Sequence, residues 1–333
     1  MRIPSIRILA AFILLLACLP AAAVAAPKAA IKAWTDPAAA LREDPDFAIQ
    51  GEYADATTGA QVVALGDGRF DAYLLEGGLP GAGWAPGKAR TVLHGGRARD
   101  EVVLKDDAGK TTATIRKDRM VVVGTDGVKT ELSRTERGSP TLGAKPPSGA
   151  VVLFDGSSAE AWENGKAEDG HLLATDCTNK NRFADYTLHL EFRTPYMPTA
   201  RGQQRGNSGV YHSGRWETQI LDSFGLDGRD NECGGIYSVA KPRLNMCLPP
   251  LVWQTYDVEF TAAKFDASGK RTAWPRITVR HNGVVVHESL ELPKDFTTAA
   301  PFTKPLDSPE GPVFLQNHGN PVVFRNIWIV PGK

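Results

Sequence analysis

Turn signals divide most of this chain into segments of strand length. Helical periodicity is nearly absent, and a short helix over 38–42 is the main exception. Elsewhere, short apolar runs end at Asp-Gly, Asn-Gly or Pro-Gly pairs, as at Asp67-Gly68 and Asn282-Gly283. Such pairs favour the tight turns of β-hairpins, and the runs are too short for ordinary helices. The chain is therefore predicted to be all-β.

The order of these segments predicts two β units. Residues 26–46 form an N-terminal segment, and 47–135 read as a small β domain with closely spaced strands. The proline-containing stretch 136–150 is typical of a linker. From 151 to 333 the strands suggest a larger sandwich of two packed antiparallel sheets, a jelly roll.

One strand of the larger unit shows clear alternation. Over 186–193, the aromatic and aliphatic side chains occupy every second position: Tyr186, Leu188, Leu190 and Phe192. Successive side chains of a strand point to opposite faces. This apolar set should face the core, and the polar set between them should line solvent or a cleft.

The N-terminus has the pattern of a secretory signal peptide over 1–25. A basic start precedes an apolar core and a run of small residues that suits cleavage before Ala26. Cys18 offers an alternative, because its context also resembles a lipoprotein signal. The protein is thus expected to be exported, either periplasmic or secreted, or held in the envelope by lipid at Cys18. Lysine plus arginine (38) balance aspartate plus glutamate (38), which argues against a nucleic-acid partner.

Export would place the cysteines in an oxidising compartment, where disulfides can form. Cys177, Cys233 and Cys247 follow the predicted signal. A Cys233–Cys247 disulfide would close a loop of about 15 residues and contribute on the order of 3 kcal/mol. Cys177 would then be unpaired. A zinc site is the weaker alternative, since no two cysteines have metal-ligand spacing.

Polar residues in the stretch 205–225 suggest a site. Glu217 and Gln219 lie two apart on a predicted strand and share a face. Asp222 shares that face only if a bulge intervenes between Gln219 and Asp222. Two carboxylates so placed can divide acid and base roles on a glycosidic bond.

Residues 151–330 resemble the 3-keto-disaccharide hydrolase domain family. The motifs that carry the resemblance lie in the expected order: Leu153-Phe-Asp-Gly156, Gly206-Asn-Ser-Gly-Val-Tyr211, Glu217-Thr-Gln-Ile-Leu-Asp222, Gly234-Gly-Ile-Tyr237, Trp253-Gln-Thr-Tyr-Asp257, His281-Asn-Gly283, Leu315-Gln-Asn-His-Gly319 and Phe324-Arg-Asn-Ile327. The resemblance implies a concanavalin A-like jelly roll with a carbohydrate cleft. The run from Glu217 is also similar to the Glu-x-Asp-x-x-Glu signature of retaining glucanases, from which Gln219 and Asp222 depart.

A 3-keto sugar suggests two mechanisms. The ketone acidifies the hydrogen on C2, so a base can remove it, expel the C1 oxygen, and let water add back. Glu217 or His212 is expected as the base, and Asp222 or His318 as the proton donor. Arg205, or a divalent cation, is expected to polarise the ketone; no other cofactor is indicated. Direct hydrolysis by Glu217 and Asp222 is the rival mechanism.

The remaining candidates are expected to bind the sugar. They are polar or aromatic and lie within the family motifs: Asn207, Ser208, Gln219, Tyr237 and Gln316. Each has a structural alternative, such as a turn, a core position or, for Glu217 and Asp222, an ion pair with Arg205 or Arg215. The predicted function is an exported enzyme that cleaves 3-keto-disaccharides or 3-keto-glycosides. A non-catalytic sugar-binding module is the alternative, and an envelope scaffold is the third.

Overall fold

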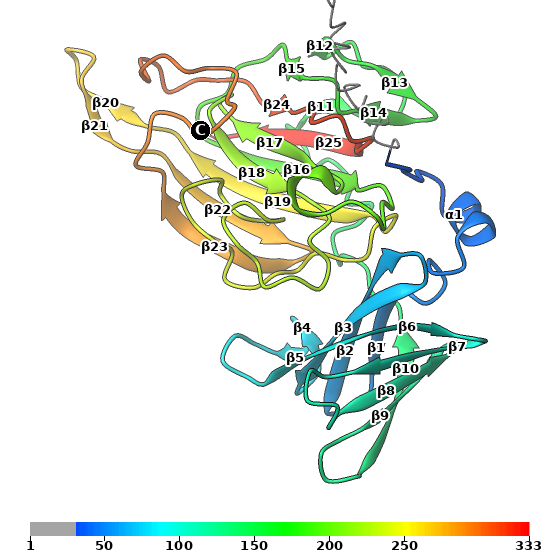
Figure 1. The fold of residues 1–333 in the computed structure, drawn as a ribbon. Helices are drawn as coiled ribbons and strands as arrows, with labels where there is room; N and C mark the ends of the chain where they lie inside the picture. The colour runs from blue at the N-terminus through cyan, green and yellow to red at the C-terminus, as the bar shows by residue number, and fades with distance from the viewer. Residues whose placement is uncertain (1–30, 333) are drawn as a thin grey trace, which may run out of the picture. The chain divides into compact units, whose positions relative to one another are not determined.

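The computed structural model describes residues 31–332 (Figure 1). The predicted signal peptide and the lipid site at Cys18 lie outside the described residues. Within residues 31–332, no helix is long and apolar enough to cross a membrane. The fold is all-β, as predicted, with a β domain followed by a larger jelly-roll sandwich.

The helix predicted over 38–42 is present as α1 (Pro37–Glu43). Asp36 caps its N-terminus and accepts a hydrogen bond from the backbone N–H of Ala39 at 2.7 Å. Pro37 suits the first turn, where its missing N–H costs nothing.

The smaller unit is a closed antiparallel barrel, a closure that the sequence did not predict. Its order is β1-β10-β9-β8-β7-β6-β3-β2. Asp67 and Gly68 join β2 to β3 with φ of 56° and 70°, the left-handed conformation that the predicted Asp-Gly turn requires. The eight strands are β1 (Gly51–Ala54), β2 (Thr58–Gly66), β3 (Arg69–Glu76), β6 (Arg90–Ala98), β7 (Glu101–Lys105), β8 (Thr112–Arg116), β9 (Arg119–Val123) and β10 (Lys129–Thr135). The short strands β4 (Leu79–Pro80) and β5 (Gly83–Trp84) pair with each other.

The sandwich begins at Val151 and consists of two sheets. The larger has the order β13-β14-β25-β16-β19-β22-β23, and β11 pairs with β25; the smaller has the order β12-β15-β24-β17-β18. The larger sheet contains β11 (Val151–Phe154), β13 (Ala167–Glu168), β14 (His171–Leu173), β16 (Tyr186–Arg193), β19 (Gln254–Thr261), β22 (Arg276–His281), β23 (Val284–Glu291) and β25 (Val323–Pro331). The smaller contains β12 (Trp162–Glu163), β15 (Cys177–Asn179), β17 (Ser208–His212), β18 (Trp216–Ile220) and β24 (Phe314–Leu315). A separate hairpin joins β20 (Lys264–Phe265) to β21 (Arg271–Ala273).

The alternation of β16 places its side chains as predicted on the core side. Tyr186, Leu188, Leu190 and Phe192 are all buried in the main hydrophobic cluster between the sheets. The polar face is also buried at its centre, because His189 and Glu191 have no exposed surface. Another segment of the chain must therefore cover this face and shield His189 and Glu191 from solvent.

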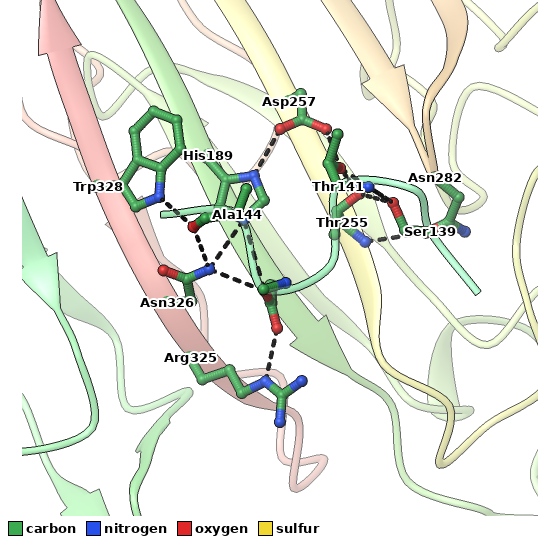
Figure 2. A network of polar contacts seen from close by, with 12 residues as sticks. Ser139, Thr141, Ala144, His189, Thr255, Asp257, Asn282, Arg325, Asn326 and Trp328 are labelled. Carbon is green, nitrogen blue, oxygen red and sulfur yellow. Dashed lines mark hydrogen bonds and ion pairs between the residues drawn. The ribbon is translucent and has the colours of Figure 1, made fainter. Parts of the chain in front are cut away.

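The segment 136–150 covers it (Figure 2). The Thr141 hydroxyl donates to Asp257 at 2.7 Å, and the N–H of Gly143 donates to Glu191 at 2.6 Å. Asn326 donates to the carbonyl of Ala144 at 3.0 Å. The segment predicted as a linker is thus hydrogen-bonded along the outer face of the larger sheet.

Buried charges hold this contact together. His189 Nδ1 lies 2.6 Å from Asp257, and Arg325 Nε lies 2.6 Å from Glu191. Burial alone would lower the pKa of His189, but its hydrogen bond to Asp257 and the Glu191 carboxylate 3.7 Å from Nε2 outweigh that effect and raise the pKa. Glu191 is thus the acidic partner of Arg325 on the closing strand.

Candidate active site

The hairpin of β17 and β18 sorts the candidate residues onto two faces. Tyr211 pairs with Glu217, and Gly209 pairs with Gln219, so these four positions share the outer face of the smaller sheet. His212 pairs with Trp216 on the opposite face, which packs into the core.

Glu217 is a buried carboxyl on the outer face. Its side chain is 2% exposed, and Oε2 lies 2.8 Å from the hydroxyl of Tyr211. Burial raises the pKa of Glu217 to about 8, although the hydrogen bond from Tyr211 lowers it in part. At neutral pH Glu217 is therefore mostly protonated and able to donate a proton.

The hydrogen bonds around Tyr211 agree with a protonated Glu217. The hydroxyl of Tyr211 also lies 3.0 Å from the carbonyl of Thr298, and Gln316 Nε2 donates to it at 3.1 Å. A phenol has a single proton, so it cannot donate to Glu217 and Thr298 together. When Glu217 is ionised, Tyr211 donates to Glu217; when Glu217 carries a proton, Glu217 can donate to Tyr211, and Tyr211 then donates to Thr298.

Gly209 leaves room for this carboxyl. A Cβ at position 209 would lie 2.2 Å from Oε1 of Glu217, far inside van der Waals contact. Any larger residue would displace the carboxyl or the strand. The glycine of the Asn-Ser-Gly motif is thus required by the side chain across the hairpin.

Asp222 is not part of this arrangement. The pairing of β17 with β18 is regular up to Ile220, where β18 ends, so the predicted bulge is absent. The Asp222 carboxylate instead lies 2.6 Å from Nε of Arg205, and both side chains are buried. The two residues line a cavity of about 180 Å³ with Val63 and Tyr73 of the barrel. The structure contradicts the predicted Glu217–Asp222 pair. Arg205, which was predicted to polarise the substrate ketone, is instead paired with the Asp222 carboxylate.

His212 is likewise misplaced for the predicted role of base. It is fully buried, with Nδ1 2.9 Å from the Tyr186 hydroxyl and Nε2 2.9 Å from the Thr218 hydroxyl. Burial lowers the pKa of His212 to about 3, so the ring is neutral at physiological pH. It is a hydrogen-bonded core residue on the face opposite Glu217.

Amide side chains gather beside Glu217 on the outer face. Asn207 and Gln219 are each 1% exposed, and both donate to Oε1 of Gln203, at 3.1 and 3.0 Å. The N–H of Asn207 donates to Asn320 at 2.8 Å. Sequence reasoning missed Gln203, because nothing in the sequence distinguishes it from its neighbour Gln204.

The loop after β24 joins this cluster. The hydroxyl of Ser208 donates to the carbonyl of Gln316 at 2.7 Å, and the N–H of Gln316 donates to Gly209. His318 follows two residues later and is exposed. Tyr237 is half-buried, and its N–H donates to the carbonyl of Glu217 at 3.1 Å. Gln316 and Tyr237 thus both contact the strand pair that carries Glu217.

The predicted disulfide is not formed. Cys233 and Cys247 are both free and buried, as is Cys177. The Cys233 sulfur lies 3.2 Å from the hydroxyl of Tyr256, and the Cys247 thiol donates to the carbonyl of Leu221 at 3.5 Å. Both thiols are thus engaged by neighbouring polar atoms.

A site for the divalent cation considered from the sequence is not evident. Across residues 31–332, no group of three or more His, Cys, Asp or Glu side chains is arranged to hold a metal ion.

Comparisons with known proteins identify the family of the larger domain. Residues 149–330 match the family model of the 3-keto-alpha-glucoside-1,2-lyase-like domain. A solved "putative glycosyl hydrolase" from Parabacteroides distasonis ATCC 8503 is 33% identical, with a TM-score of 0.51, over 56% of this chain and 85% of that chain. A second structure with the same description and organism is 19% identical, with a TM-score of 0.41, over 56% of this chain and 94% of that one. No protein of the curated collection matches.

Proposed function

The chain belongs to the 3-keto-alpha-glucoside-1,2-lyase-like family, and from this membership and the site we propose that it cleaves the glycosidic bond of 3-keto-disaccharides or 3-keto-glycosides. The observation that carries the proposal is the buried Glu217, whose pKa is raised to about 8. A carboxylic acid that keeps its proton at neutral pH can protonate a departing glycosidic oxygen.

The proposed route is elimination followed by hydration. A base takes the proton from C2, which the C3 ketone acidifies, and an enolate forms. The electron pair then makes a C1–C2 double bond, the bond from C1 to the glycosidic oxygen breaks, and Glu217 protonates that oxygen. Water adds to the resulting enone at C1, and a proton returns to C2. The products are 3-keto-glucose and the free alcohol, with no net oxidation.

The base is assigned to His318. It is exposed and lies two residues from Gln316, whose amide donates to the Tyr211 hydroxyl beside Glu217. Histidine is the most frequent general base in enzymes. His212 cannot take this role from the core, and Glu217 carries the proton that the leaving oxygen needs. In this proposal the acid comes from strand β18 and the base from the loop after β24.

Sugar hydroxyls are assigned to the amides of the same face. Gln219 lies two residues beyond Glu217, and Asn207 and Gln316 complete the polar set. Tyr237 is proposed to stack on a sugar ring. The chain is also proposed to act outside the cytoplasm, on the strength of the signal pattern over 1–25.

To test the proposed cleavage, the full chain is incubated with 3-keto-trehalose and a 3-keto-glucoside, and unoxidised trehalose is the control. Release of 3-keto-glucose from both keto substrates, and nothing from trehalose, is expected. In D₂O the product should carry deuterium at C2, because the C2 proton is removed and replaced. Cleavage without deuterium at C2 would favour direct hydrolysis. Binding without cleavage of either keto sugar would favour a sugar-binding module.

A further inference from the structure

The single turn η1 (Gly202–Gln204) holds two adjacent glutamines with different surroundings. Gln203 is half-buried, and its side chain makes hydrogen bonds to three residues: Asn207, Gln219 and Asn231. Gln204 is exposed, and its side chain makes no hydrogen bond within residues 31–332. The turn therefore presents one glutamine to the site and the other to solvent.

Gln203 has a fixed orientation. Its Nε2 donates to the carbonyl of Asn231 at 2.8 Å, which leaves Oε1 as an acceptor. Nδ2 of Asn207 and Nε2 of Gln219 both donate to that oxygen. Nδ2 of Asn207 also donates to the backbone carbonyl of Gln203 at 2.8 Å. Nε2 of Gln219 also donates to the carbonyl of Asn231 at 3.4 Å. Both amide nitrogens thus donate to Gln203, and these bonds set the direction of both amide groups.

The opposite ends of these amides have no partner. Oδ1 of Asn207 and Oε1 of Gln219 are buried side-chain acceptors without a hydrogen bond. A buried acceptor left unpaired is costly, and native proteins rarely keep one without a function. Gln219 lies on the same face of the hairpin as Glu217, and no donor within residues 31–332 reaches either oxygen.

The barrel strand β2 supports the turn from both flanks. Nη2 of Arg201 donates to the carbonyl of Leu65 at 2.8 Å. Nη1 of Arg205 donates to the carbonyl of Ala64 at 3.4 Å. The two arginines lie immediately before and after η1, so the barrel fixes the backbone from which Gln203 extends.

We propose that Gln203 is a positioning residue that aims the unpaired oxygens of Asn207 and Gln219 at two hydroxyl donors of the sugar. This inference rests on the proposed function. It restricts the substrate to a sugar with two hydroxyl groups that can donate to the neighbouring oxygens of Asn207 and Gln219. A site built to hydrogen-bond a hydroxyl strongly rejects an analogue that lacks it. The barrel then contributes to ligand recognition through Arg201 and Arg205 without touching the ligand.

Three full-chain variants test the proposal: Gln203→Met, Gln203→Glu and Gln204→Met. Methionine removes the shared acceptor at similar size, and glutamate retains an acceptor for both amides. We expect KM for 3-keto-trehalose to rise about tenfold in Gln203→Met with kcat within twofold, because the loss of one to two neutral hydrogen bonds has about this effect. Gln204→Met should stay within twofold of the wild type. Gln203→Glu keeps the shared acceptor but loses the donor to the carbonyl of Asn231, so its KM should lie between those of the wild type and Gln203→Met.

A binding measurement separates this proposal from the proposed reaction. Calorimetric titration with 3-keto-trehalose in the Glu217→Gln background measures the affinity for the sugar while cleavage is slow. If the wild type fails to cleave but Gln203→Met still weakens binding about tenfold, the positioning role stands and the reaction fails. Three results would overturn the positioning role. They are an unchanged affinity in Gln203→Met, an equal loss of affinity in Gln203→Glu, and no binding of the sugar by any variant.

Discussion

Replacement of Glu217 by glutamine should change how the stability of the protein depends on pH. The folded protein holds the proton of Glu217 with a pKa of about 8, against 4.5 for an ordinary glutamate. Between these values the folded state keeps a proton that the unfolded chain has released. The stabilisation from protonated Glu217 is therefore complete below pH 4.5 and is lost as pH rises towards 8.

The size of the effect follows from the shift. One pKa unit corresponds to about 1.4 kcal/mol, so the free energy of unfolding of the wild type should fall by about 1.4 kcal/mol per pH unit relative to Glu217→Gln. From pH 5 to pH 7 the difference between the two proteins should change by roughly 3 kcal/mol, and it should level off above about pH 8. Glutamine has nearly the shape of a protonated glutamate and does not titrate.

Urea unfolding followed by tryptophan fluorescence at pH 5, 6, 7, 8 and 9 measures this difference. Every other ionisable group is common to both proteins and cancels. Glu259→Gln replaces an exposed carboxyl on β19 and controls for the substitution itself. A difference between wild type and Glu217→Gln that stays constant from pH 5 to pH 8 would refute the raised pKa and, with it, the proton donor.

Two further substitutions test the geometry. Gly209→Ala should lower activity on 3-keto-trehalose by about 100-fold, because its Cβ displaces the Glu217 carboxyl. This is the lower end of what a general acid contributes. Gly138→Ala, where a Cβ meets nothing, is the control, and equal activities of the two variants would be inconsistent with the packing described. Asp222→Asn should reduce the free energy of unfolding by about 3–5 kcal/mol, since it leaves Arg205 buried without its charge partner. Asp227→Asn removes an exposed carboxylate from a pair with the half-buried Arg90 and should cost about 0–1 kcal/mol. Equal losses in urea unfolding would argue against a buried ion pair at Asp222.

Local patterns in the sequence predicted much of the fold. The alternation over 186–193 predicted the core face of β16, and Asp67-Gly68 predicted a hairpin turn, because each depends only on neighbouring residues. The family motifs marked the strand pair that carries Glu217. Closure of the barrel was not predictable, since it depends on β1 pairing with β10 across the whole unit.

The errors at the site have a common physical origin. Asp222 was assigned by its spacing from Glu217, but its position depends on where β18 ends and on an ion pair with Arg205, 17 residues earlier. His212 was assigned by residue type, but the register of the hairpin turns it into the core beside Tyr186. The raised pKa of Glu217 arises from burial by distant segments. These properties are set by tertiary contacts that local spacing does not encode.

The covering of β16 is a further example. The prolines of 136–150 suggested a linker, but the hydrogen bonds of Thr141 and Gly143 require Asp257 and Glu191. Those partners lie far along the chain, so only the folded structure reveals the contact.

The pH dependence of kcat/KM for cleavage of 3-keto-trehalose tests the central claim most directly. If Glu217 is the proton donor, kcat/KM should fall with one proton lost above about pH 8, where Glu217 ionises. Glu217→Gln should be at least about 100-fold slower below that pH and should lack this descending limb. A Glu217→Gln protein that cleaves at the wild-type rate, or that retains the same decline above pH 8, would contradict the assignment.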